Sequence, residues 1–148
     1  MLGRVCTRMS FRFTNDKIVR RLRWLMVGVM LFDKLNTVVG QPNTYWQQPE
    51  TVREGNPFFR FFLAHGLPAY VLFSLVYVSL VFVLVSFVPR RCALVGIFAF
   101  ILGHYYGAST WLHRHWHFGV AGPIIYGLVI AGCIVFLAFP RPPEPNGQ

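Results

Sequence analysis

Long apolar runs separated by short polar segments dominate the chain. The runs extend over residues 24–40, 67–88, 92–112 and 119–139. A helix of about 20 apolar residues crosses the hydrocarbon core of a bilayer, which is about 30 Å thick. The pattern therefore predicts four membrane-spanning helices.

The second apolar run continues backwards from residue 67 to Pro57. A single helix over residues 57–88 would be about 48 Å long at about 1.5 Å per residue, which is more than one crossing needs. Pro68 lacks a backbone N–H and disfavours a continuous helix, and Gly66 precedes it closely. We therefore predict a short interfacial helix over residues 57–65. The predicted fold is all-α, an integral membrane four-helix bundle with this interfacial helix before the second span.

The two ends of the chain differ from the apolar middle. Residues 1–23 are basic and are expected to form a cytoplasmic N-terminal segment, and residues 24–139 are expected to form the membrane domain. Asp33 and Lys34 interrupt the first apolar run and no A-x-A-like cleavage site is found, so we expect a retained span rather than a signal peptide. Residues 140–148 are polar and rich in proline, which predicts a disordered tail.

The distribution of charge predicts how the protein is oriented in the membrane. The chain has 14 Lys and Arg against 5 Asp and Glu, a net charge of +9, although only 13% of residues are charged. In the four-span arrangement, ten basic residues flank one side and three flank the other, with Lys34 inside the first span. Basic residues accumulate on the cytoplasmic side of membrane proteins. We therefore predict a multi-pass protein in the lipid bilayer with both termini cytoplasmic, and no nucleic-acid partner.

Asp33 is the most informative polar residue of the apolar runs. It follows the basic segment by ten residues, which places it about 15 Å into the membrane. An ionised carboxylate there costs about 2.5 to 3.5 kcal/mol on insertion scales, so it needs a partner. Asn36 and Thr37 lie on the same helical face, and His104 lies at a similar depth in the third span. We predict that Asp33 meets His104 or its neighbours on that span.

A second polar group precedes the interfacial helix. Asn56 and Pro57 are typical of a helix start, and a carboxylate such as Glu54 suits the positive end of a helix. Alternatively, Glu54 and Asn56 fold back over the outer mouth of the bundle. We predict an outward-facing polar pocket over which the Tyr45-Trp46 loop closes. Its walls are expected to comprise Asp33, Thr37, Glu54, Asn56 and His104.

Histidines suggest a metal in the same region. His113, His115 and His117 alternate, so an extended segment would place them on one face and could bind a transition metal such as zinc. His104, Asp33 and Glu54 are the further candidate ligands. In a helix His115 would turn away from the other two, and the plainer interpretation is that these histidines contact lipid headgroups.

Three glycines mark a candidate packing face on the third span. Gly103 and Gly107 form a G-x-x-x-G pair, which allows close approach of another helix, and Gly96 extends the same face. Helix packing and a functional site are both open interpretations of this segment.

The spacing of Asp33-x-x-x-Thr37 followed by Glu54-x-Asn56-Pro57 resembles a group of small prokaryotic multi-spanning proteins known as DUF5658. The resemblance covers roughly the first 65 residues. It implies a four-helix membrane scaffold, in keeping with a prokaryotic inner (plasma) membrane, and it implies no particular activity.

Three functions fit these observations. The one we predict is an accessory or assembly subunit whose helices pack against other membrane-protein subunits. The first alternative is a metal-dependent membrane enzyme with an outward-facing site, because a metal-bound water would supply a nucleophile. The second alternative is an ion or proton conduit that uses Asp33 and His104 as relay groups.

Overall fold

The computed structural model describes residues 16–115 and 119–138, and all regular secondary structure in this part of the chain is helical, without strands. The elements are α1 (Lys17–Val39), η1 (Asn43–Trp46), η2 (Pro49–Thr51), α2 (Pro57–Ala64), α3 (Leu67–Phe87), α4 (Arg90–His115) and α5 (Ala121–Ala138). The prediction of an all-α fold is confirmed.

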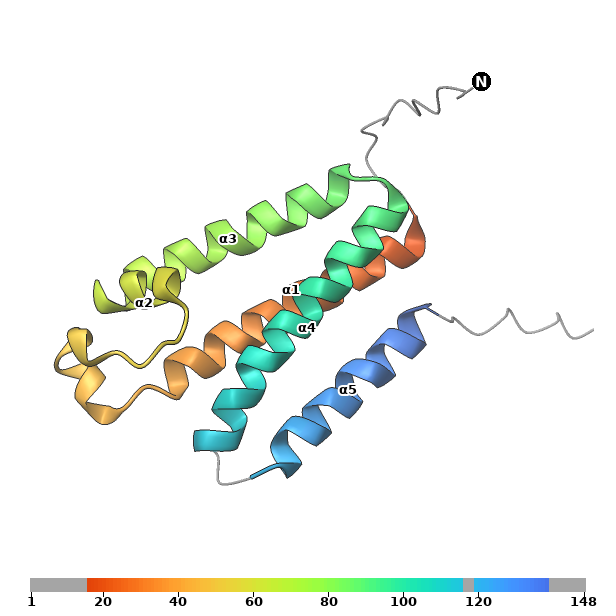
Figure 1. The fold of residues 1–148 in the computed structure, drawn as a ribbon. Helices are drawn as coiled ribbons and strands as arrows, with labels where there is room; N and C mark the ends of the chain where they lie inside the picture. The colour runs from red at the N-terminus through yellow and green to blue at the C-terminus, as the bar shows by residue number, and fades with distance from the viewer. Residues whose placement is uncertain (1–15, 116–118, 139–148) are drawn as a thin grey trace, which may run out of the picture.

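The helices are arranged around a central pair. Figure 1 shows α1 and α4 side by side, with α3 and α5 on opposite sides of them. The apolar core lies where α1, α3 and α4 meet, and Ile130 of α5 joins it. Its fully or almost fully buried side chains include Val19, Leu22, Met26, Met30, Val81, Val85, Ile97 and Ile101.

Three of the described helices are long and apolar enough to cross a membrane, namely Leu67–Phe87, Arg90–Arg114 and Ala121–Ala138. They correspond to the second, third and fourth predicted spans and support a membrane protein. Helix α1 is not among them, and it carries six charged residues between Lys17 and Lys34. A crossing by α1 therefore stays a prediction.

Helix α1 begins at Lys17, well before the predicted start of the first span at residue 24. Asp16 caps this end, because its carboxylate accepts the backbone N–H groups of Ile18 at 2.8 Å and Val19 at 3.1 Å. The hydrogen bond from Val19 is the largest cause that lowers the pKa of Asp16, and Arg90 at 2.9 Å adds to it, while desolvation opposes them. Residues 17–23 of the predicted basic segment are therefore the first turns of α1.

The predicted break before α3 is present. Helix α2 ends at Ala64, and Gly66 adopts φ +104°, a conformation that side chains other than glycine rarely adopt. Asn56 caps α2, because its side chain accepts the N–H groups of Phe58 at 3.0 Å and Phe59 at 3.4 Å. This confirms the predicted helix start. Phe59 then packs against α3, so the short helix lies beside the first turns of the second apolar span.

Candidate functional site

Asp33 and His104 are in direct contact, as the sequence predicts. The Asp33 Oδ2 atom lies 2.8 Å from the Nδ1 atom of His104, and the two side chains are 8% and 10% exposed. Asp33 comes from α1 and His104 from α4, the two helices of the central pair. This pairing reduces the cost of placing a carboxylate among apolar helices.

Lys34 provides the positive charge that balances the Asp33 carboxylate. Its ammonium lies 3.2 Å from the same Asp33 Oδ2 atom and 3.4 Å from the centre of the Phe59 ring on α2. Neighbouring residues of a helix point about 100° apart, and the length of the Lys34 side chain brings its charge back to the Asp33 carboxylate. Opposite charge and an aromatic face both stabilise a desolvated ammonium.

Tyr77 of α3 extends the polar chain on the other side of His104. Its hydroxyl lies 3.5 Å from Nε2 of the imidazole. An ionised Asp33 fixes the tautomer with the proton on Nδ1, which leaves Nε2 with a lone pair. The arrangement can therefore accept a hydrogen bond or a proton at Nε2.

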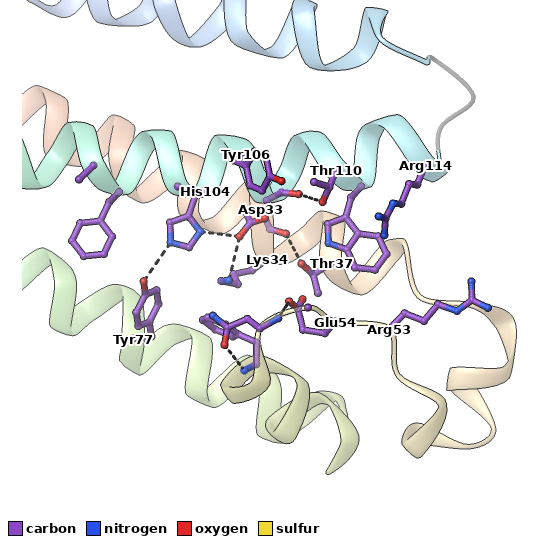
Figure 2. Close-up of a pocket in the computed structure, with 18 residues that line it drawn as sticks. Asp33, Lys34, Thr37, Arg53, Glu54, Tyr77, His104, Tyr106, Thr110 and Arg114 are labelled. Carbon is purple, nitrogen blue, oxygen red and sulfur yellow. Dashed lines mark hydrogen bonds and ion pairs between the residues drawn. The ribbon is translucent and has the colours of Figure 1, made fainter.

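These groups line a cavity of about 710 Å³ (Figure 2). The five residues of the predicted pocket are all among its lining residues, together with aromatic and basic side chains that the sequence analysis did not assign. The lining comprises Asp33, Lys34, Thr37, Arg53, Glu54, Gly55, Asn56, Phe59, Tyr77, Ala99, Phe100, Gly103, His104, Tyr106, Gly107, Thr110, Trp111 and Arg114.

The loop that carries Glu54 is held in place by Gln41. The amide of Gln41 donates to the carbonyl of Arg53 at 2.9 Å and accepts the N–H of Arg53 at 2.8 Å. Gln41 also donates to the carbonyl of Thr37 at 2.9 Å, which connects the loop to the last turn of α1. One buried side chain thus fixes Glu54 beside the cavity.

The predicted closing loop of the pocket is wrong, and the candidate polar residue Asn36 lies outside the cavity lining. Asn36 is not among the lining residues, because its amide donates to the carbonyl of Phe32 at 2.8 Å within α1. The Tyr45-Trp46 segment does not close over the cavity either. Tyr45 packs towards α2 and donates to the carbonyl of Leu63 at 3.0 Å, and burial raises its pKa. Residues 53–56 border the cavity instead.

The part of the predicted metal set that the structure describes does not assemble. Within residues 16–115 and 119–138, no three His, Cys, Asp or Glu side chains come close enough to hold a metal ion. His113 and His115 belong to helix α4 rather than to the extended segment that would have placed them on one face. His117 lies outside the described residues. Asp33, Glu54 and His104 all line the cavity without forming a ligand group.

The three glycines of α4 have different surroundings. A Cβ atom at Gly107 would lie 2.6 Å from Asp33 Oδ1, so this glycine lets the carboxylate approach α4. A Cβ atom at Gly103 would have no neighbour within 4 Å, and one at Gly96 would make an ordinary contact with Val85 at 3.6 Å. The close approach predicted for the G-x-x-x-G pair is therefore found at Gly107 and not at Gly103.

Tyr77 and Trp111 belong to the site, although the sequence pattern did not predict them. Tyr77 lies ten residues after the start of α3, so counting depth from the outer end of that span would have placed it near Asp33. Trp111 packs over Gly40 at the end of α1, where a Cβ atom would overlap its indole ring. That contact has no signal in the sequence pattern.

Comparison of the chain with protein-family models, with curated proteins and with solved structures gave no match.

Proposed function

We propose that α1, α3, α4 and α5 form a four-helix bundle that crosses the membrane four times, with both termini on the cytoplasmic side. Three apolar helices and the packing of α1 along them support the bundle. The excess of basic residues at the end where α1 begins supports the orientation. In this arrangement the cavity faces the outer side.

We further propose that the protein binds a small polar ligand in this outward-facing cavity. The observation that carries the proposal is a space of about 710 Å³ lined by the buried Asp33–His104 pair. A polar clasp that only joined two helices would be surrounded by close-packed side chains, as protein interiors generally are. Ligand sites in proteins commonly measure about 300 to 1,000 Å³ and contain a few converging polar groups.

The side chains between the cavity and the beginning of α1 favour a pocket that opens on one side only over an ion or proton conduit. Between His104 and Arg23, the core formed by α1, α3 and α4 is built from apolar side chains such as Met26, Met30, Ile97 and Ile101. A relay needs polar groups or water along the whole path. The metal-dependent enzyme has less support as well, because the described residues offer no group of three ligands.

A second candidate function is the accessory or assembly subunit, and α5 is the observation that favours it. Among its residues Ala121–Ala138, only Ile130 is buried, and the exposed side chains of this helix leave a broad face for lipid or for helices of another subunit. A ligand-binding cavity and a partner on α5 are compatible with each other.

The cavity proposal is tested with the full chain purified in lipid nanodiscs. Native mass spectrometry detects bound small molecules and lipids, and the H104Q variant is compared with S86A, which alters a buried polar group far from the cavity. We expect a bound species in the wild type and in S86A, and its loss in H104Q. A wild type without any bound species, or equal occupancy in H104Q, would overturn the proposal. A protein that co-purifies in fixed ratio through α5 would support the accessory role.

A further inference from the structure

The charged groups of the cavity are sorted along its length. Figure 2 shows Tyr77 and His104 at one end and Arg53 and Arg114 at the other, with Asp33 and Glu54 between them. Building on the proposed function, we infer that the ligand is a zwitterion with an ammonium group and a phosphate. The ammonium binds beside Glu54 and the aromatic rings, and the phosphate faces Arg53 and Arg114.

Glu54 is the carboxylate that suits an incoming cation. Its side chain is partly exposed and accepts the backbone N–H of Asn56 at 2.8 Å, and it forms no ion pair within the described residues. Aromatic rings surround the same space, and a ring face attracts an ammonium ion. These rings belong to Phe59, Tyr77, Phe100, Tyr106 and Trp111.

Lys34 shows how this cavity binds an ammonium group. Its own Nζ atom lies 3.2 Å from Asp33 and 3.4 Å from the centre of the Phe59 ring. A carboxylate and an aromatic face thus already bind one ammonium. Glu54 and the remaining rings offer the same two kinds of group to a second one.

Arg53 and Arg114 provide positive charge at the end of the cavity where we infer that the phosphate binds. Both are exposed, both line the cavity, and neither forms an ion pair within residues 16–115 and 119–138. A guanidinium group binds phosphate through two parallel hydrogen bonds. Further inward, Lys34 already balances Asp33, and Glu54 is the carboxylate without an ion pair among the described residues, so it suits a cationic inner part of the ligand.

This chemistry has two sources, the ethanolamine headgroup of an outer-leaflet phospholipid and a free phosphoethanolamine. In the lipid arm, the protein is reconstituted with phosphatidylethanolamine or with phosphatidylglycerol, which has the phosphate but no ammonium, and bound lipid is counted by native mass spectrometry. In the soluble arm, phosphoethanolamine, ethanolamine and inorganic phosphate are titrated against the protein in nanodiscs of phosphatidylglycerol.

We expect the zwitterion to bind at least about tenfold more tightly than either half alone, in one arm or both, and the arm that shows it identifies the source. E54Q should weaken binding about tenfold, because glutamine still accepts the Asn56 N–H but lacks the charge. E50Q is the matched control, since Glu50 is an exposed carboxylate on η2 that does not line the cavity. R114Q should weaken binding similarly, and R91Q, which lies at the other end of α4, should not.

The outcomes separate this inference from the proposed function. Equal binding of phosphatidylglycerol and phosphatidylethanolamine, with no preference for phosphoethanolamine, would overturn the zwitterion, and so would an unchanged affinity in E54Q. If such binding is nevertheless lost in H104Q, the cavity still binds a polar ligand and the proposed function stands. If no probe binds and no species co-purifies, both proposals fail.

Discussion

Helix α1 carries buried charged groups in both halves of the molecule, and their surroundings differ. Arg23, near the beginning of α1, is 1% exposed, donates a hydrogen bond to the Ser86 hydroxyl of α3, and lies with its guanidinium carbon 5.3 Å from the centre of the Phe82 ring. Asp33, further along the same helix, contacts Lys34 and His104 and lines a cavity of about 710 Å³.

The difference lies in what surrounds each group. Val19, Leu22 and Val85, which lie near Arg23 and Ser86 in the sequence, are buried in the apolar core. Around Asp33, polar side chains from several elements converge and space is left between them. A buried charge by itself therefore indicates only that a partner is needed. The unfilled space beside a satisfied charge is what points to a ligand.

The largest expected effect comes from breaking the charge balance of the cavity. The D33N substitution leaves the Lys34 ammonium buried without its counter-charge, and such a loss typically costs about 3 to 5 kcal/mol. The double variant D33N/K34M should recover most of the free energy of unfolding, because no unpaired charge is left. Denaturant titration in detergent micelles measures both. A double variant no more stable than D33N would show that the ion pair is not what stabilises this region.

The next effect concerns the close approach of Asp33 to α4. The G107A substitution places a methyl group 2.6 Å from Asp33 Oδ1, and His104 and Lys34 restrict the movement of that carboxylate. We expect a loss of about 1 to 3 kcal/mol in the free energy of unfolding. G103A is the matched control on the same helix, because its methyl group meets nothing within 4 Å and alanine favours a helix by up to about 1 kcal/mol. Equal stabilities of the two variants would contradict the expected close approach.

A smaller effect is expected at the opposite end. S86A removes the hydroxyl that accepts from Arg23, and hydrogen bonds to charged groups contribute about 1.5 to 3 kcal/mol. We expect the free energy of unfolding to fall by about 1.5 kcal/mol, near the lower limit of this range. The reason is that the Arg23 guanidinium also faces the Phe82 ring. Ligand binding should be unchanged. S79A, an exposed serine of the same helix, is the control and should behave like the wild type. A binding defect in S86A would mean that the two halves are coupled.

The smallest effect is a pH dependence at the beginning of α1. The pKa of Asp16 is lower in the folded protein than its ordinary value of 3.8, chiefly because of the Val19 N–H. Its stabilisation is therefore complete above the ordinary pKa and is lost as pH falls through the lowered one. Denaturant titrations between about pH 5 and pH 2 should show a smaller decline for D16N than for the wild type. Parallel curves would exclude a contribution from Asp16.

The sequence by itself determined the positions of the helices and the need for partners. Apolar runs of membrane length predicted α3, α4 and α5, and Gly66 with Pro68 predicted the break before α3, since these are properties of local chemistry. The cost of a carboxylate in an apolar run, together with matching depth, predicted the contact of Asp33 with His104. Depth along a helix follows from a constant rise per residue, so it can be counted without a structure.

Tertiary structure decided the direction and spacing of side chains. The sequence did not show that Lys34 reaches back to Asp33, that Gln41 fixes the Glu54 loop, or that Gly107 rather than Gly103 adjoins the carboxylate. Each depends on how the helices are rotated about their axes and how far apart they lie, and many contacts distant in sequence fix these quantities together. The cavity has the same origin, because empty space is a property of the packing of several helices and no residue type encodes it.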